Sequence, residues 1–290
     1  MNKASWLKLV PFLLLNVSIL LSGLLKALQV SLGYYPIIGL KQLTLGYYQS
    51  VLGDPHFQRS LLYTCYLALT TAGLSLVLGL SLALVVLKRS ERSKWAVGLL
   101  QLPIALPHII VVMMVLQMVA QTGLLSRVML ALGLINDGGS FPLLVHDRAG
   151  VGIILVFLYK QIPYVAVTLL AILRRVDLQY VLVAKTLGAS FWQRFWHIVF
   201  PLIQPTLLTL FVILFAFVFG SFEVPYMLGS PSRETLAVTA YTLFSQADLA
   251  KRPQGMALNL IMSAICTTVV LVSLAISRRL PGGQGGGRYE

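Results

Sequence analysis

The sequence predicts an all-α integral membrane protein with six transmembrane helices. Of its 290 residues, 58% are hydrophobic and only 11% are charged, which is not the balance of a soluble domain. Apolar runs of about 20 residues or more, long enough to span a bilayer as helices, recur along the chain. The net charge of +13 is divided among short loops rather than gathered in one patch, which favours membrane orientation over nucleic acid as its explanation.

The first predicted span covers about residues 9–32. Its basic start and apolar centre are also found in signal peptides. However, the run is long, lacks a convincing small-x-small cleavage site and leads into further apolar runs. We therefore interpret it as the first transmembrane helix.

The second and third predicted spans cover about residues 60–87 and 95–120. Within the second, a small side chain recurs every fourth residue, which lets another helix approach closely. These small residues are Thr71, Ser75, Gly79 and Ala83. Within the third, Pro103 and Pro107 free backbone carbonyls and favour a kink.

The remaining predicted spans cover about residues 149–173, 202–222 and 256–276. A short helix is predicted over residues 124–134, along the outer surface. These spans and their loops form one transmembrane domain over residues 1–280. A flexible tail rich in glycine follows at 281–290.

The loop between the fourth and fifth spans, residues 174–200, gathers four basic residues against one acid and does not look built for lipid. Gly188 supplies a turn after a first short helix, and Ser190 caps a second one. Pro201 sits in the first turn of the following span, where its missing N–H costs nothing. An ordinary cytoplasmic loop lying on anionic headgroups is the alternative interpretation.

This loop resembles the cytoplasmic coupling segment of type I ABC importer permeases, whose pattern is Glu-Ala-Ala-x3-Gly-x9-Ile-x-Leu-Pro. The matching residues are Ala184, Gly188, Ile198 and Pro201, and Leu187-Gly188-Ala189-Ser190 reads like many family members. The sequence departs from the pattern at Leu182, Val183 and Phe200. The order of spans also resembles the family along nearly the whole chain.

The resemblance implies a permease subunit of an ATP-driven, binding-protein-dependent importer, with a coupling helix that docks on an ATPase. The implied partners are a dimer of ABC ATPase subunits, a second permease that is identical or homologous, and an extracytoplasmic substrate-binding protein. The implied location is the bacterial inner membrane. The residues implied to couple to the ATPase are Leu182, Val183, Ala184, Gly188, Ala189, Ile198 and Pro201.

Two ionisable residues are candidates for the solute pathway. Lys160 lies about 11 residues into the fourth span, hence about 16 Å deep at 1.5 Å per residue. A lysine at that depth requires a carboxylate, a bundle-facing carbonyl or a water-filled path. Glu223 stands at the outer end of the fifth span, where a solvated interfacial carboxylate is the alternative. Their different depths argue against a direct pair.

Residues 222–226 and 251–255 resemble the permeases that import polyamines, thiamine, ferric iron or aminophosphonates. An outer-facing Glu223 suits a cationic solute, but one carboxylate does not choose among these substrates. We predict a polyamine-type substrate group on this resemblance alone.

The chain shows no catalytic or nucleotide-binding signature. Its four histidines are scattered, and neither Gly-x-Ser-x-Gly nor Gly-x4-Gly-Lys-Ser/Thr is present. We therefore predict no cofactor, no metal and no enzymatic activity on this chain. A stand-alone secondary carrier or channel is the alternative function. We detect no inverted repeat, and intramembrane acids are scarce, which both argue against this alternative.

Basic residues set the predicted orientation. Six spans place both termini on one side, and thirteen of the 22 Lys and Arg residues lie on that side, against seven in the opposite loops. The other two, Lys26 and Lys160, lie within spans. Loops on the cytoplasmic side carry the excess of basic residues, so both termini and residues 174–200 are predicted to be cytoplasmic.

Cysteine labelling tests this topology. In a variant without Cys65 and Cys266, a single cysteine at position 137 or 248 should react with an impermeant reagent added from outside. A cysteine at position 190 should react only after the membrane is opened. The reverse pattern would contradict the six-span topology.

Overall fold

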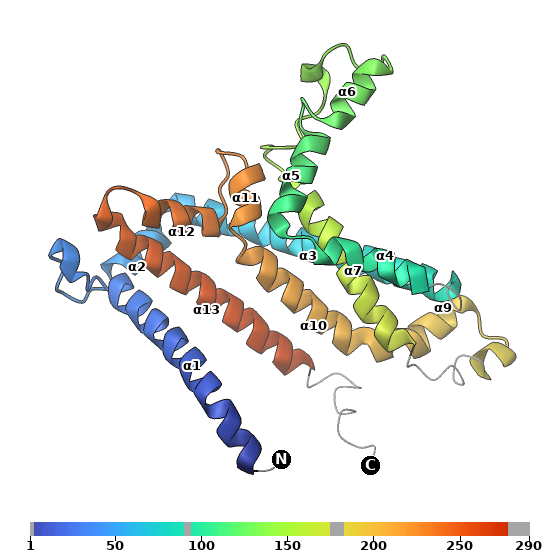
Figure 1. Ribbon diagram of the computed structural model, residues 1–290, viewed down its shortest axis with the longest axis horizontal. Coiled ribbons are helices and arrows are strands. Elements are labelled where there is room, and N and C mark those ends of the chain that lie inside the picture. Colours follow the sequence, from blue (N-terminus) through green and yellow to red (C-terminus); the bar gives the residue numbers. More distant parts are fainter. Residues whose placement is uncertain (1–2, 90–93, 175–182, 278–290) are drawn as a thin grey trace. The chain divides into compact units, whose positions relative to one another are not determined.

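A computed structural model describes residues 3–89, 94–174 and 183–277 (Figure 1). In these residues the regular structure is helical, and six stretches are long and apolar enough to cross a membrane, which confirms the predicted fold class. These stretches are Val10–Ser31, Pro55–Leu87, His108–Ala131, Val151–Leu173, Phe191–Phe219 and Leu249–Ile276. The predicted tail, 281–290, lies outside the described residues.

The chain forms two compact units, the first of which comprises residues 1–61 and 236–265. Its elements are α1 (Lys3–Ser31), η1 (Pro36–Ile38), α2 (Gly46–Gly53), the start of α3 (Pro55–Arg89), α12 (Leu236–Ser245), η4 (Leu249–Lys251) and the first half of α13 (Arg252–Ser277). Arg252 Nη1 donates to the Tyr35 hydroxyl at 3.0 Å. The Arg252 guanidinium also lies 4.9 Å from the centre of the Phe244 ring, so one arginine joins the loop after α1 to α12.

The second unit, residues 62–235 and 266–290, holds both predicted sites. Its elements are the rest of α3, α4 (Lys94–Ala105), α5 (His108–Val119), α6 (Leu124–Ala131), η2 (Gly138–Ser140), α7 (Val151–Leu173), α9 (Phe191–Arg194), η3 (Phe195–Val199), α10 (Phe200–Phe219), α11 (Glu223–Leu228) and the end of α13. α7 is the core helix, because it packs against α4, α5, α10 and α11. Phe157, Val165 and Leu169 on α7 are fully buried.

The third predicted span is not one kinked helix but two separate helices. Pro103 is accommodated inside α4, whereas the chain leaves the helix at Leu106 and starts α5 after Pro107. A proline disfavours the helical conformation of the residue before it, which explains the break at this position. Figure 1 shows α4 and α5 leaving the break in different directions.

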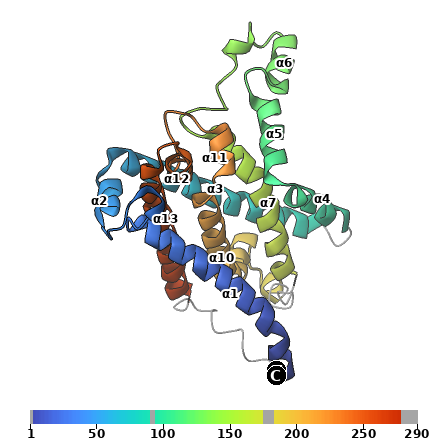
Figure 2. The same cartoon turned by 60° about the vertical axis from the view of Figure 1, so that its left-hand side comes forward.

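The predicted short outer helix is present as α6, and Figure 2 shows it beyond the end of α5. α6 packs against α5 and η2. Its apolar side chains Leu124, Val128 and Leu130 are each about half exposed. The arm formed by α5 and α6 therefore offers apolar surface to lipid or to another protein.

The start of α7 is fixed by the loop before it. The Asp147 carboxylate accepts hydrogen bonds from the backbone N–H groups of Ala149 and Val151, both at 2.9 Å. It thus caps the helix in place of the N-cap residue Gly150, which has no side chain. His146 adopts a left-handed backbone with φ 59°. The backbone N–H of His146 donates to the Leu228 carbonyl at 2.9 Å, and this bond ties the loop to the end of α11.

The small-residue face of α3 receives α7, as the sequence predicts. Thr71, Ser75 and Ala83 are fully buried. Ser75 Oγ donates to Gln161 Oε1 on α7 at 2.9 Å. A Cβ atom on Gly79 would lie only 2.6 Å from Val165 Cβ, so the two helices touch where this side chain is absent.

Gly79→Ala should therefore destabilise the protein. The added methyl group must push α7 away from α3, at a cost of about 1–3 kcal/mol for overpacking. Thermal unfolding of the purified protein in detergent measures the effect. Gly73→Ala is the matched control, because Gly73 lies on the same helix and its added Cβ meets no atom within 4 Å. Equal melting temperatures for the two variants would contradict this account of the contact.

Candidate functional site

The loop predicted as the coupling segment turns at Gly188. Residues 183–186 are helical, and Gly188 follows with φ 82°. The Gly188 N–H donates to the Lys185 carbonyl at 3.0 Å, and the Ala189 N–H donates to the Ala184 carbonyl at 2.9 Å. This pair of bonds is a Schellman motif, which ends a helix with a residue in the left-handed conformation. The predicted glycine turn is confirmed.

The second short helix is capped as predicted, with a full capping box. Ser190 Oγ accepts the Gln193 N–H at 3.3 Å, and Gln193 Oε1 accepts the Ser190 N–H at 2.8 Å. Two backbone donors at the start of α9 are thereby satisfied within the segment itself. The turn and the cap fix the direction in which the chain enters the next helix.

The second short helix does not end before the fifth span, which differs from the prediction. α9, the π-helical turn η3 and α10 follow one another without a break from Phe191 to Phe219. In η3 the Phe200 N–H bonds to the Phe195 carbonyl, five residues back. Pro201 lacks an N–H, and in an α-helix its ring would clash with the carbonyl four residues before it. The wider π-helical turn avoids that clash. The span also ends at Phe219, three residues earlier than predicted.

The residues predicted to couple to an ATPase differ in exposure. The side chain of Val183 is 58% exposed, and that of Leu187 beside it is 82% exposed. Ala184, Ala189, Ile198 and Pro201 are half-buried, and Gly188 is exposed. Leu182, where the family pattern has Glu, lies outside the described residues. The described part of the segment thus presents a small apolar surface beside the turn.

Lys160 reaches the break between α4 and α5. Its Nζ donates to the Leu106 carbonyl at 2.5 Å and lies 3.2 Å from His108 Nδ1. In an unbroken helix the Leu106 carbonyl would accept the Ile110 N–H, which instead bonds to Pro107. Of the partners that the sequence left open for this lysine, the structure selects a bundle-facing carbonyl. The sequence offered no signal for His108, which lies 52 residues away along the chain.

An aromatic contact places α10 against His108, the neighbour of Lys160. The His108 ring lies 5.1 Å from the Phe217 ring, and Phe217 meets Phe157 of α7 edge to face at 6.2 Å, both measured between ring centres. Glu223 is exposed at the first position of α11. It makes no direct pair with Lys160, whose partners among the described residues are Leu106 and His108, and this agrees with the prediction.

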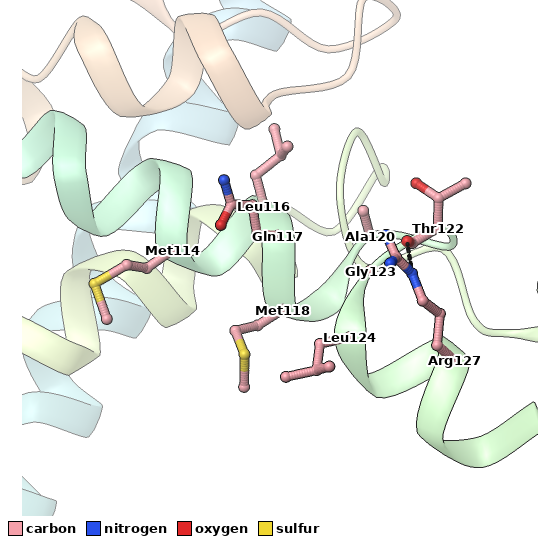
Figure 3. A pocket seen from close by; sticks show the side chains of 9 residues that line it. All are labelled: Met114, Leu116, Gln117, Met118, Ala120, Thr122, Gly123, Leu124 and Arg127. Atoms are coloured by element: carbon pink, nitrogen blue, oxygen red, sulfur yellow. Dashed lines mark hydrogen bonds between the residues drawn. The ribbon is translucent and has the colours of Figure 1, made fainter. Parts of the chain in front are cut away.

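A pocket of about 590 Å³ lies where α5 ends and α6 begins. Figure 3 shows the side chains that line it. Met114, Met118 and Leu124 supply much of its wall. Arg127 lines it as well, but its Nε donates to the Thr122 carbonyl at 3.0 Å. None of these residues is a site residue predicted from the sequence, and most of the lining is apolar.

The family described as binding-protein-dependent transport system inner membrane component matches residues 75–280. That range includes the helix break, Lys160 and the segment from 183 to 201. The inner membrane ABC transporter permease protein YcjO of Escherichia coli (strain K12) is 31% identical over 232 residues, which cover 78% of this chain and 76% of YcjO. The chain belongs to this family of permeases.

The permease is also similar to longer and to structurally known proteins. It is 27% identical over 241 residues to the inner membrane ABC transporter permease protein YnjC of the same strain, covering 81% of this chain and 44% of YnjC. A solved bacterial alginate ABC transporter, in complex with its alginate pentasaccharide-bound periplasmic protein, matches with a TM-score of 0.70 and 20% identity. The match covers 95% of this chain and 93% of that one, and it shows the shared fold. The protein is thus a multi-pass inner-membrane transport permease rather than an enzyme.

The capping box of the permease can be tested by hydrogen exchange. Ser190→Ala removes the acceptor for the Gln193 N–H, a loss of about 1 kcal/mol for a helix N-cap. Exchange of the hydrogen-bonded amides of Gln193 and Arg194 should become about fivefold faster, since that factor corresponds to the same energy. Ser190→Thr is the control, because it keeps the hydroxyl group. Unchanged exchange in Ser190→Ala would show that the box does not hold this end of the helix.

Proposed function

We propose that this permease forms half of the solute pathway in an ATP-driven, binding-protein-dependent importer, and that residues 183–201 couple it to a separate ATPase subunit. The observation that carries the proposal is the turn at Gly188 followed by helix without a break from Phe191 to Phe219. A push on the turn acts on the start of a rigid element that continues across the membrane.

The energy for transport comes from the partner, because the sequence shows no phosphate-binding Gly-x4-Gly-Lys-Ser/Thr motif. A short helix seated in a groove of the ATPase would carry closure of the nucleotide sites into the permease as a rigid-body movement. Val183 and Leu187 supply exposed apolar side chains for that groove. Leu182 would extend the apolar contact, in place of the charged contact that Glu makes elsewhere in the family.

The complete importer contains further subunits. Two permeases, identical or homologous, enclose the pathway, since six spans with one coupling segment form half of it. Two ATPase subunits bind on the cytoplasmic side, where both termini of the permease lie, and a substrate-binding protein delivers the solute from outside. Lys160 and Glu223 are the proposed pathway residues, and the polyamine-type substrate group stays a prediction.

Gly188→Val tests the coupling role. A β-branched side chain at φ 82° costs about 1–2 kcal/mol of backbone strain. No atom lies within 4 Å of the added Cβ, so the strain falls on the turn and not on the packing of the spans. The variant should reach the membrane, retain little or no ATPase subunit in detergent and lose uptake.

Gly188→Asn is the matched control, because asparagine tolerates the left-handed conformation. It should keep both the bound ATPase subunit and uptake. Normal coupling in Gly188→Val, or equal loss in both variants, would remove the turn from the mechanism.

A further inference from the structure

Lys160 is a charge in the membrane without a counter-ion on this chain's described residues. It is the tenth of 23 residues in the candidate span Val151–Leu173. None of the nine Asp and Glu residues falls within any of the six candidate spans. In the part of the chain that the structure describes, the partners of the ammonium are Leu106 and His108, and both are uncharged acceptors. The positive charge is therefore hydrogen-bonded but not neutralised.

The start of α5 adds positive potential beside Lys160, and the neutral His108 ring offers a further N–H donor. An ammonium only donates, so His108 Nδ1 is the acceptor and the neutral ring carries its proton on Nε2. His108 is also the first residue of α5, a helix of 12 residues whose free N–H groups and dipole favour negative charge at that end.

This basic centre is partly open and lies beside the helix that leads from the coupling segment. Lys160 and His108 are both half-buried, and Tyr164, one turn along the same face of α7, is 36% exposed. Phe217, near the end of α10, packs on the His108 ring at 5.1 Å between ring centres. Movement of α10 therefore bears directly on the imidazole.

We propose that Lys160 and His108, at the break between α4 and α5, form a binding site for the anionic group of the transported solute. The ammonium and the imidazole Nε2–H donate to a carboxylate, phosphonate, sulfate or similar oxyanion as it passes. The proposal rests on the proposed importer function and names its substrate class. Among the solutes of the predicted substrate group, aminophosphonates carry such an anion, whereas polyamines and thiamine are cations.

Lys160 could instead serve only to hold the break together, and two substitutions separate these roles. Lys160→Gln keeps an N–H donor for the Leu106 carbonyl but removes the charge. Lys160→Arg keeps the charge and the donors. Lys26→Gln is the matched control, because it removes a lysine from another candidate span, Val10–Ser31, where the side chain is exposed on α1.

The experiment uses the complete importer, with its ATPase and binding protein, in proteoliposomes. Uptake is measured for five anionic probes, sulfate, molybdate, phosphate, citrate and 2-aminoethylphosphonate, and for two cationic probes, putrescine and thiamine. ATP should drive uptake of at least one anion and of neither cation. Lys160→Gln should lower that uptake by about tenfold or more, the loss expected for one charge-assisted hydrogen bond, while Lys160→Arg and Lys26→Gln keep most of it.

Three results would overturn the proposal: no anion is taken up, a cation is the cargo, or Lys160→Gln transports the anion normally. Dissociation of the importer in Lys160→Gln would also overturn it, because the charge would then serve a carboxylate of the second permease. Retention of the ATPase subunit on the unmodified permease reports the importer function without any solute. Failure of that binding is thus distinguishable from failure of the anion site.

Discussion

The hydrogen bond from Lys160 to the Leu106 carbonyl is the contact on which the centre of the larger unit depends. Water is absent from the hydrocarbon core, so a backbone carbonyl released by a helix break must find a donor within the protein. Pro107 creates the break, and α7 supplies the donor. The same bond gives the lysine an acceptor, but it leaves the charge in place. A neutral donor would be enough to satisfy the carbonyl, whereas a charged one can also bind an anionic solute.

The position of α7 makes this contact possible. Asp147 caps its first turn, and the missing side chain of Gly79 lets α3 press against its other side. A helix held at its start and along one face presents Lys160 at a fixed depth. The contacts of Gly79 and Lys160 therefore both depend on where α7 lies, although the two residues are on different helices.

The segment after α7 combines one fixed bend with a continuous helix. A Schellman turn at Gly188 and a capping box at Ser190 define one bend, and beyond it the helix runs on through the π turn into α10. Because hydrogen bonds continue along this path, a displacement at the Gly188 end is carried along the span rather than absorbed in a loop. Near the other end of α10, Phe217 packs on the His108 ring, so the proposed coupling segment and the proposed anion site contact the same helix.

Local rules explain most of what the sequence determined. Apolar run lengths fixed the class and the number of spans, and the residue types at Gly188 and Ser190 specified their turn and cap, because caps and turns depend on a few neighbouring residues. Local rules also indicated that Pro107 perturbs the third span, but they did not decide between a kink and a break. The partner of Lys160 was beyond them altogether. Leu106 and His108 meet this lysine across more than 50 residues of sequence, and only the packing of α4 and α5 on α7 brings them together.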